Sequence, residues 1–167
     1  VDLRRQAETE TWLAAARPDV VFLAAGHVGG IQANSTYPAE FLYDNLMIQS
    51  NVIHQSFLAG VKKVCFLGSS CIYPRECPQP MREEHLMTGK LEPTNEGYAV
   101  AKLAGVNMME CYRRQYGLSG VSPIPCNLYG TNDSFDPRSA HVLSSLVRKF
   151  VDAVDGGVER CDERVDA

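Results

Sequence analysis

The 167-residue sequence lacks the features by which several broad classes of protein are recognised. It contains no run of about twenty apolar residues, so we expect no membrane-spanning helix and no membrane partner. Its formal net charge is −4, so it lacks the basic surface with which nucleic-acid-binding proteins contact phosphates. It also lacks a basic leader followed by an apolar stretch and a cleavage site, which would mark a secreted protein.

The six cysteines are scattered along the chain, and no two of them have the C-x-x-C spacing. Proteins held together by disulfides are usually shorter and richer in cysteine. The four histidines show none of the paired spacings with cysteine that are typical of zinc sites. We therefore expect reduced thiols, no bound metal and a cytoplasmic location.

The composition is that of an ordinary globular domain, with 45% hydrophobic and 22% charged residues. Three apolar segments are typical of strands covered on both faces: residues 19–25, 63–69 and 120–126. Segments with helical spacing precede, separate and follow them: residues 9–17, 40–59, 97–116 and about 139–154. This alternation predicts an α/β fold with a parallel sheet and crossover helices.

Two segments fall outside that alternation. Residues 73–95 hold four of the nine prolines and are expected to form a loop with one helical turn near Glu83. Residues 155–167 offer no apolar face, so we expect them to form a loose tail.

Polar groups that could carry chemistry follow the second predicted strand. In parallel α/β sheets, functional groups gather beyond the carboxyl ends of the strands, where Ser69 and Cys71 stand. By themselves these two would more often be part of a serine-rich turn with an inert cysteine. Tyr98 and Lys102, however, are spaced i and i+4 and share one face of the next helix. Because an ammonium favours a nearby phenolate, we expect the pKa of Tyr98 to fall toward neutrality, which would make it a usable proton donor and acceptor.

The order of these motifs resembles the extended branch of the short-chain dehydrogenase/reductase superfamily, whose members act on nucleotide sugars. Within it, several further motifs resemble the GDP-L-fucose synthase family over roughly residues 2–150. These motifs are Val28-Gly-Gly-Ile31, Thr36-Tyr-Pro38, Ser69-Ser-Cys-Ile-Tyr-Pro74, Leu91-Glu-Pro-Thr-Asn-Glu96, Arg114-Gln-Tyr-Gly117 and Asn127-Leu-Tyr-Gly130. The resemblance implies a partial Rossmann-type, doubly wound parallel sheet with flanking helices, and an incomplete NADP-binding domain over residues 1–154.

The resemblance also implies a reaction, namely the NADPH-dependent 3,5-epimerisation and 4-reduction of GDP-4-keto-6-deoxy-D-mannose to GDP-L-fucose. In that reaction Ser69 would hydrogen-bond the 4-keto oxygen of the sugar. Tyr98 would protonate this oxygen as NADPH delivers hydride, and Lys102 would hold the nicotinamide ribose. Cys71 and His141 would move protons at C3 and C5, on opposite faces of the sugar.

Further binding residues and a partner follow from the same resemblance. The residues implied to contact NADP are Ala24, Ala25, Leu67, Gly68, Ser69, Ser70, Lys102, Pro125, Asn127, Leu128 and His141. Asn127 and Lys149 are implied to contact the GDP-sugar. The helices over 40–59 and 97–116 would pair with their copies in a homodimer, with Met47, Met108 and Met109 in the contact unless they face the sheet.

The sequence also departs from the family. It has no G-x-x-G-x-x-G, the loop that cradles the cofactor diphosphate, so we expect the first βαβ unit to be missing. One edge and one face of residues 19–25 would then be exposed, and NADPH would bind weakly. Lys149 stands where the family usually has arginine, and His27 where it usually has lysine.

Two alternatives remain open. One is a different epimerase or dehydratase of the same superfamily. Ser69-Ser70-Cys71 disfavours a dehydratase, which normally has Thr-Asp-Glu or Ser-Asp/Glu-Glu there. The other is a non-catalytic binding module or an inert gene fragment.

Overall fold

The computed structural model describes residues 1–136 and 140–157, and their elements alternate as the sequence predicts. The strands are β1 (Val20–Leu23), β2 (Lys63–Phe66) and β3 (Gly120–Val121). The α-helices are α1 (Gln6–Ala16), α2 (Ile31–Thr36), α3 (Pro38–Leu58), α4 (Glu96–Tyr116) and α5 (Val142–Asp155). Three short 3-10 turns, η1 (Ser70–Ile72), η2 (Glu83–His85) and η3 (Pro93–Asn95), lie between β2 and α4. The turn predicted near Glu83 is thereby confirmed as η2.

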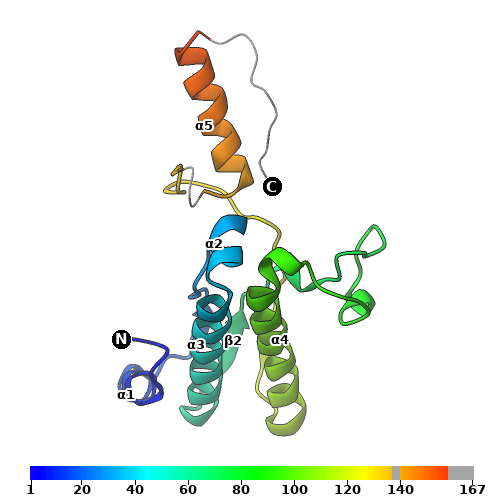
Figure 1. The fold of residues 1–167 in the computed structure, drawn as a ribbon. Coiled ribbons are helices and arrows are strands. Elements are labelled where there is room, and N and C mark those ends of the chain that lie inside the picture. The colour runs from blue at the N-terminus through cyan, green and yellow to red at the C-terminus, as the bar shows by residue number, and fades with distance from the viewer. Residues whose placement is uncertain (137–139, 158–167) are drawn as a thin grey trace.

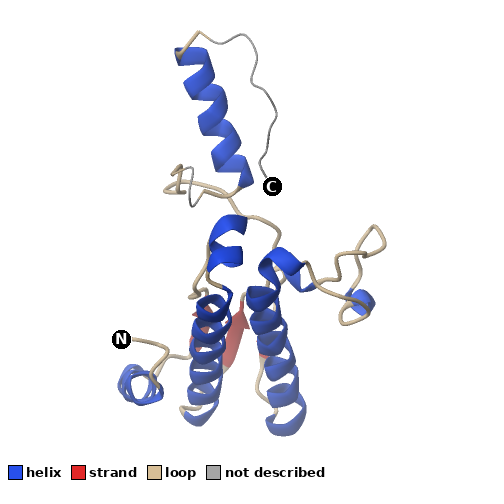
Figure 2. Cartoon of the chain, viewed as in Figure 1, coloured by secondary structure: helices blue, strands red, loops and turns tan. Residues whose placement is uncertain are grey.

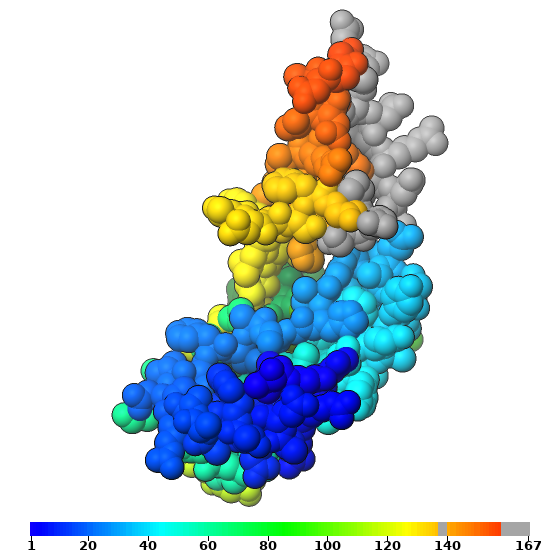
Figure 3. All heavy atoms as spheres, turned by 90° about the vertical axis from the view of Figure 1, so that its left-hand side faces the viewer, coloured from blue at the N-terminus to red at the C-terminus, as the bar shows by residue number. Residues whose placement is uncertain are grey.

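The three strands form one parallel sheet in the order β1-β2-β3, which confirms the partial Rossmann-type architecture. Helices α3 and α4 lie side by side in front of this sheet, and α1 packs against α3 (Figures 1 and 2). Helix α5 projects from one end of the molecule, which the space-filling view shows from the side (Figure 3). None of the described helices is both long and apolar enough to cross a membrane.

The strands are shorter than the sequence predicts, and β3 shows why. It ends at Val121 although a strand was expected over 120–126. Pro123 and Pro125 have no amide hydrogen, so they cannot donate to a ladder. Their carbonyls still accept hydrogen bonds from Gly68 N–H at 2.9 Å and Ser70 N–H at 3.2 Å. The segment therefore runs beside the end of β2 and is held from one side only.

The core lies between the sheet and the two long helices. Its buried members are Leu23, Val52, Ile53, Val61, Val64, Phe66, Met109 and Leu118. Met108 packs against this core and Met109 is 5% exposed, so these two do not face outward, contrary to one reading of the sequence. Helix α4 approaches the sheet closely at Gly105, where an added Cβ would lie 2.4 Å from Phe66 Cζ.

The opposite face of the sheet is open. Phe22 is 75% exposed, and the strand register places Cys65 and then Val121, which is 55% exposed, in the same row across the sheet. The predicted exposure of one face of residues 19–25 is therefore confirmed. The helix start expected near residue 139 and nearly all of the tail expected over 155–167 lie outside the described residues.

Candidate active site

The segment that follows β2 is held in place by a buried side chain and by backbone hydrogen bonds to the segment after β3. Ile72 in η1 is completely buried and anchors the turn. Gly68 and Ser70 donate backbone hydrogen bonds to the segment after β3. Ser69, between them, and Cys71 are both partly exposed at the carboxyl end of the strand. The polar group of each is therefore presented at the edge where ligands bind in α/β sheets.

Helix α4 brings Tyr98 and Lys102 to the same edge. The Lys102 side chain is almost fully buried, and its Nζ donates a hydrogen bond of 2.9 Å to the carbonyl oxygen of Leu67. Nζ also lies 5.8 Å from the centre of the Tyr98 ring and 5.0 Å from that of Phe66. The ammonium thus lies over the face of the phenol ring, a cation–π arrangement.

Ser69 connects the tyrosine with the cysteine. Its side chain hydrogen-bonds with both Tyr98 and Cys71, and each of these bonds acts to lower the partner's pKa. Cys71 in turn interacts electrostatically with Tyr98 and Lys102. Ser69, Cys71, Tyr98 and Lys102, which the sequence singled out from two distant segments, therefore form one cluster.

The electrostatics of this cluster differ from the sequence-based expectation in one respect. Burial, followed by the nearby Cys71, raises the pKa of Tyr98 to about 12, so the expected fall toward neutrality is wrong. Lys102 lies over the ring and does not offset the effect of burial on Tyr98, and burial also lowers the pKa of this lysine. Burial raises the pKa of the Cys71 thiol as well, against opposing effects of Ser69 and Lys102. At neutral pH, Tyr98 and Cys71 are therefore both protonated and able to donate a proton.

Several other predicted site residues lie in the segments that follow β1 and β3. Ala24 and Ala25 are exposed directly after β1, and an added Cβ on the next residue, Gly26, would lie 3.7 Å from Lys102 Nζ. Asn127 and Leu128 are exposed in the segment that follows β3.

His141 and Lys149 lie elsewhere. His141 is the N-cap residue of α5 and lies near Asp133, whose pKa is lowered chiefly by a hydrogen bond from Ser144. Lys149 is exposed on the same helix. Among the described residues, no hydrogen bond or ion pair joins His141 to Ser69, Cys71 or Tyr98. The structure thus brings together four of the five predicted catalytic residues and leaves His141 apart.

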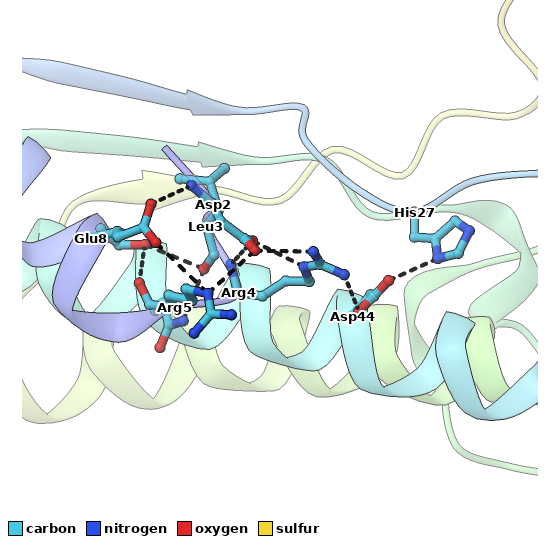
Figure 4. Close-up of polar contacts among 9 residues, drawn as sticks. Asp2, Leu3, Arg4, Arg5, Glu8, His27 and Asp44 are labelled. Carbon is cyan, nitrogen blue, oxygen red and sulfur yellow. Dashed lines mark hydrogen bonds and ion pairs between the residues drawn. The ribbon is translucent and has the colours of Figure 1, made fainter.

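Sequence reasoning missed a polar network beside this edge, which Figure 4 shows. His27 Nδ1 lies 3.0 Å from Asp44 Oδ2, and the same carboxylate accepts a hydrogen bond of 3.2 Å from Arg4. The His27 ring stacks on Phe41 with 4.3 Å between the ring centres. The buried Asn45 side chain bonds both the N–H and the carbonyl of His27. The loop after β1 is therefore held rigidly, and a sequence signal for it exists only in the polar pair Asp44–Asn45 within an apolar helix.

Comparison with known proteins identifies the class to which this fold and cluster belong. The model of the NAD dependent epimerase/dehydratase family matches residues 1–161, and the chain belongs to that family. The chain is 53% identical over 159 residues to GDP-L-fucose synthase 1 of Arabidopsis thaliana, covering 95% of this chain and 49% of that protein. It is 54% identical over 142 residues to GDP-L-fucose synthase of Escherichia coli, covering 85% and 44%. The resemblance to GDP-L-fucose synthases is thereby confirmed.

Solved structures agree with this classification. A GDP-L-fucose synthetase from Naegleria fowleri bound to NADP superposes with a TM-score of 0.86 at 28% identity, over 99% of this chain and 54% of that one. MlghC, a GDP-mannoheptose C4 reductase from Campylobacter jejuni with NADP bound, has a TM-score of 0.86 at 41% identity, over 95% and 48%. The chain spans about half the length of the curated relatives it matches.

Proposed function

We propose that the protein to which these residues belong catalyses the NADPH-dependent 3,5-epimerisation and 4-reduction of GDP-4-keto-6-deoxy-D-mannose to GDP-L-fucose. The observation that carries this proposal is the cluster of Ser69, Cys71, Tyr98 and Lys102 at the carboxyl end of β2. It combines a group able to bind a ketone oxygen, a group able to protonate it and a thiol able to act at a neighbouring carbon.

In this proposal the 4-keto oxygen accepts hydrogen bonds from Ser69 and Tyr98. The raised pKa keeps Tyr98 in the phenol form at neutral pH, which is the form that donates a proton. NADPH, when bound, would supply the hydride chemistry at C4. Ser69 orients the phenol through the hydrogen bond that the two side chains already share.

The residues present fit the nicotinamide-ribose part of NADP. One N–H of Lys102 is used by the Leu67 carbonyl, and among the described residues no acceptor takes the other two. An ammonium has three donors, so two remain for the hydroxyls of a ribose. The small, exposed Ala24 and Ala25 leave the end of β1 open to a flat ligand. In the proposal, Leu67, Gly68, Ser70, Pro125, Asn127 and Leu128 complete this contact from the neighbouring segments.

Epimerisation is assigned to Cys71 and His141. A thiol held in its protonated form by burial is suited to return a proton to carbon, and an imidazole is suited to remove one. His141 lies at the start of α5, at the end of the molecule toward which the carboxyl edge of the sheet faces (Figure 1). In the proposal it acts from the opposite face of the sugar, and it also contacts NADP. Asn127 and Lys149 bind the GDP-sugar, Lys149 through its charge on the diphosphate.

The chimera that tests this proposal uses the Escherichia coli relative as the host. This chain replaces the matching 142-residue segment, and the chimera is assayed for NADPH oxidation with GDP-4-keto-6-deoxy-mannose. GDP-L-fucose as the product supports the proposal. Reduction with retained configuration at C3 and C5 would instead indicate a C4 reductase, and no NADPH oxidation by a folded chimera would refute it.

The proposed assembly is a homodimer formed by α3 and α4 with their copies, in a cytoplasmic protein. Large side chains on these helices support it, since Tyr43, Leu58 and Tyr116 are each more than half exposed. The cytoplasmic location is proposed because the five described cysteines are free, and free thiols persist in reducing compartments. Light scattering of the chimera at micromolar concentration tests the assembly, and a monomer would contradict it.

A further inference from the structure

Residues 75–90 form a surface loop whose ends are tied together. The Arg75 N–H donates a hydrogen bond of 2.9 Å to the Lys90 carbonyl, which closes the loop at its base. Farther out, Asn107 Nδ2 of α4 lies 3.7 Å from Met87 Sδ and tethers the loop to the helix. The loop projects from α4 on the side away from α3 (Figure 1, green). It is a compact loop of the kind that often carries function.

A thiol and an imidazole meet inside this loop. Cys77 Sγ lies 3.5 Å from His85 Nδ1, and the Arg82 N–H donates to the same nitrogen at 3.2 Å. A nitrogen that accepts a backbone N–H carries a lone pair, so the proton of the neutral ring is on Nε2. Nδ1 has one lone pair, so the Cys77 thiol donates to it only by sharing that lone pair with the Arg82 N–H. This arrangement consists of a nucleophile, a base within reach of its proton, and a third group that orients the base.

The other described cysteines lack this feature. Cys65 and Cys71 are half-buried in the sheet and in the cluster described above, and Cys111 and Cys126 are exposed. Among the described residues, Cys77 is the cysteine that is hydrogen-bonded to a histidine. If exposure alone governed reactivity, Cys111 and Cys126 would react before the partly exposed Cys77.

The charges around the thiol are of both signs. Arg82 pairs with Glu84 at 3.8 Å, and Arg75 pairs with Glu92 at 3.4 Å. Charge therefore does not select the reaction partner, and an uncharged disulfide probes the thiol and its base without an electrostatic contribution.

We propose that Cys77 is a site of covalent thiol modification, with His85 as its base and a low-molecular-weight disulfide as its reaction partner. Cys77 Sγ attacks one sulfur of the disulfide, and a new S–S bond forms as the old one breaks. The thiol proton passes to His85 Nδ1 and then to the departing thiolate, which leaves as a free thiol. The products are one mixed disulfide at Cys77 and one thiol, so no further oxidant is needed.

The test uses the 167-residue chain with bis(2-hydroxyethyl) disulfide near pH 7.5, quenched at intervals and mapped by peptide mass spectrometry. Cys77 should be modified about 10-fold faster than Cys111 or Cys126, a modest effect of base assistance because Arg82 shares the same nitrogen. His85→Asn is the matched variant, since the amide oxygen of asparagine can accept both hydrogen bonds but cannot take a proton. In this variant the rate ratio should fall to about 1.

Three results would overturn the proposal. The first is faster modification of Cys111 or Cys126 than of Cys77 in the native chain. The second is an unchanged rate ratio in His85→Asn. The third is a preference for Cys77 that persists in concentrated urea, because it would then come from the local sequence and not from the folded loop. Cys161 lies outside the described residues and does not enter the comparison.

Discussion

Lys102 on α4 donates a 2.9 Å hydrogen bond to the carbonyl oxygen of Leu67, just beyond the end of β2. This bond joins a helix to a strand end across 35 residues of sequence and fixes the position of the ammonium beside Tyr98. The site is therefore already assembled by backbone and side-chain contacts within these residues.

Lys102→Met keeps the apolar stem and removes the ammonium. The hydrogen bond to Leu67 is lost, but so is the cost of burying a charge, which lowers the pKa of this lysine. The free energy of unfolding of the 167-residue chain should therefore change by no more than about 1 kcal/mol. NADPH binding by the chimera should weaken about 10-fold or more, as measured by fluorescence titration. Unchanged NADPH affinity would show that Lys102 does not hold the cofactor.

The raised pKa of Tyr98 predicts a loss of stability at high pH. A folded-state pKa of about 12, above the unfolded value near 10, means that the unfolded chain releases this proton first. Stability is therefore fully present below pH 10 and falls as pH rises toward 12. Between pH 9 and 11 the loss due to Tyr98 should be about 1 kcal/mol.

The control for this loss is Tyr98→Phe, followed by urea unfolding at both pH values. The variant retains Lys102, whose pKa is lowered by burial. This lysine makes the free energy of unfolding rise with pH, which is opposite to the effect of Tyr98. The native chain should lose more stability than Tyr98→Phe across this range. Equal losses would mean that the phenol is not buried as the structure has it.

Gly105→Ala should destabilise the chain, although alanine is the better helix former. An added Cβ would lie 2.4 Å from Phe66 Cζ and 2.8 Å from Gln49 Oε1, so α4 must move away from the sheet. We expect a loss of about 1–3 kcal/mol in the free energy of unfolding, the usual cost of overpacking. Gly130→Ala, where nothing lies within 4 Å, is the control and should be neutral. A Gly105→Ala variant as stable as the control would place α4 farther from Phe66.

Phe22→Ser should reduce self-association of the 167-residue chain without unfolding it. The Phe22 side chain lies on the open face of the sheet and is 75% exposed, so little buried area is lost. Exposed apolar strands promote aggregation. Dynamic light scattering should show smaller particles for Phe22→Ser at equal concentration. Leu23→Ser on the covered face, 3% exposed, should instead cost about 3 kcal/mol or more.

The sequence predicts the sheet and most of the cluster because both follow from local patterns. Apolar runs fixed the identity of the three strands, and the i, i+4 spacing put Tyr98 and Lys102 on one helix face. The early end of β3 could also have been predicted from the sequence, because Pro123 and Pro125 cannot donate hydrogen bonds to a ladder.

What the sequence could not give is orientation in three dimensions. The pKa of Tyr98 depends on whether Lys102 lies beside the hydroxyl or over the ring, and burial by distant segments decides the outcome. The contact of His27 with Asp44 joins a loop to a helix 17 residues away, and the sequence spacing of these two residues does not predict it. The sequence leaves open whether Met109 faces the sheet or solvent, because that depends on where the sheet lies against α4.

The most direct test of the proposed division of labour is deuterium incorporation into GDP-4-keto-6-deoxy-mannose, followed by mass spectrometry, in the chimera. Tyr98→Phe removes the proton donor for the ketone oxygen, so reduction should fall about 100-fold or more. Exchange at C3 and C5 should continue, because it depends on Cys71 and His141. Cys71→Ser should lose the product inverted at C3 and C5 while still binding NADPH, since a hydroxyl is a far weaker acid than a thiol and cannot return the proton. If Tyr98→Phe abolishes exchange as completely as reduction, or if Cys71→Ser forms the inverted product normally, the roles assigned to these two residues are wrong.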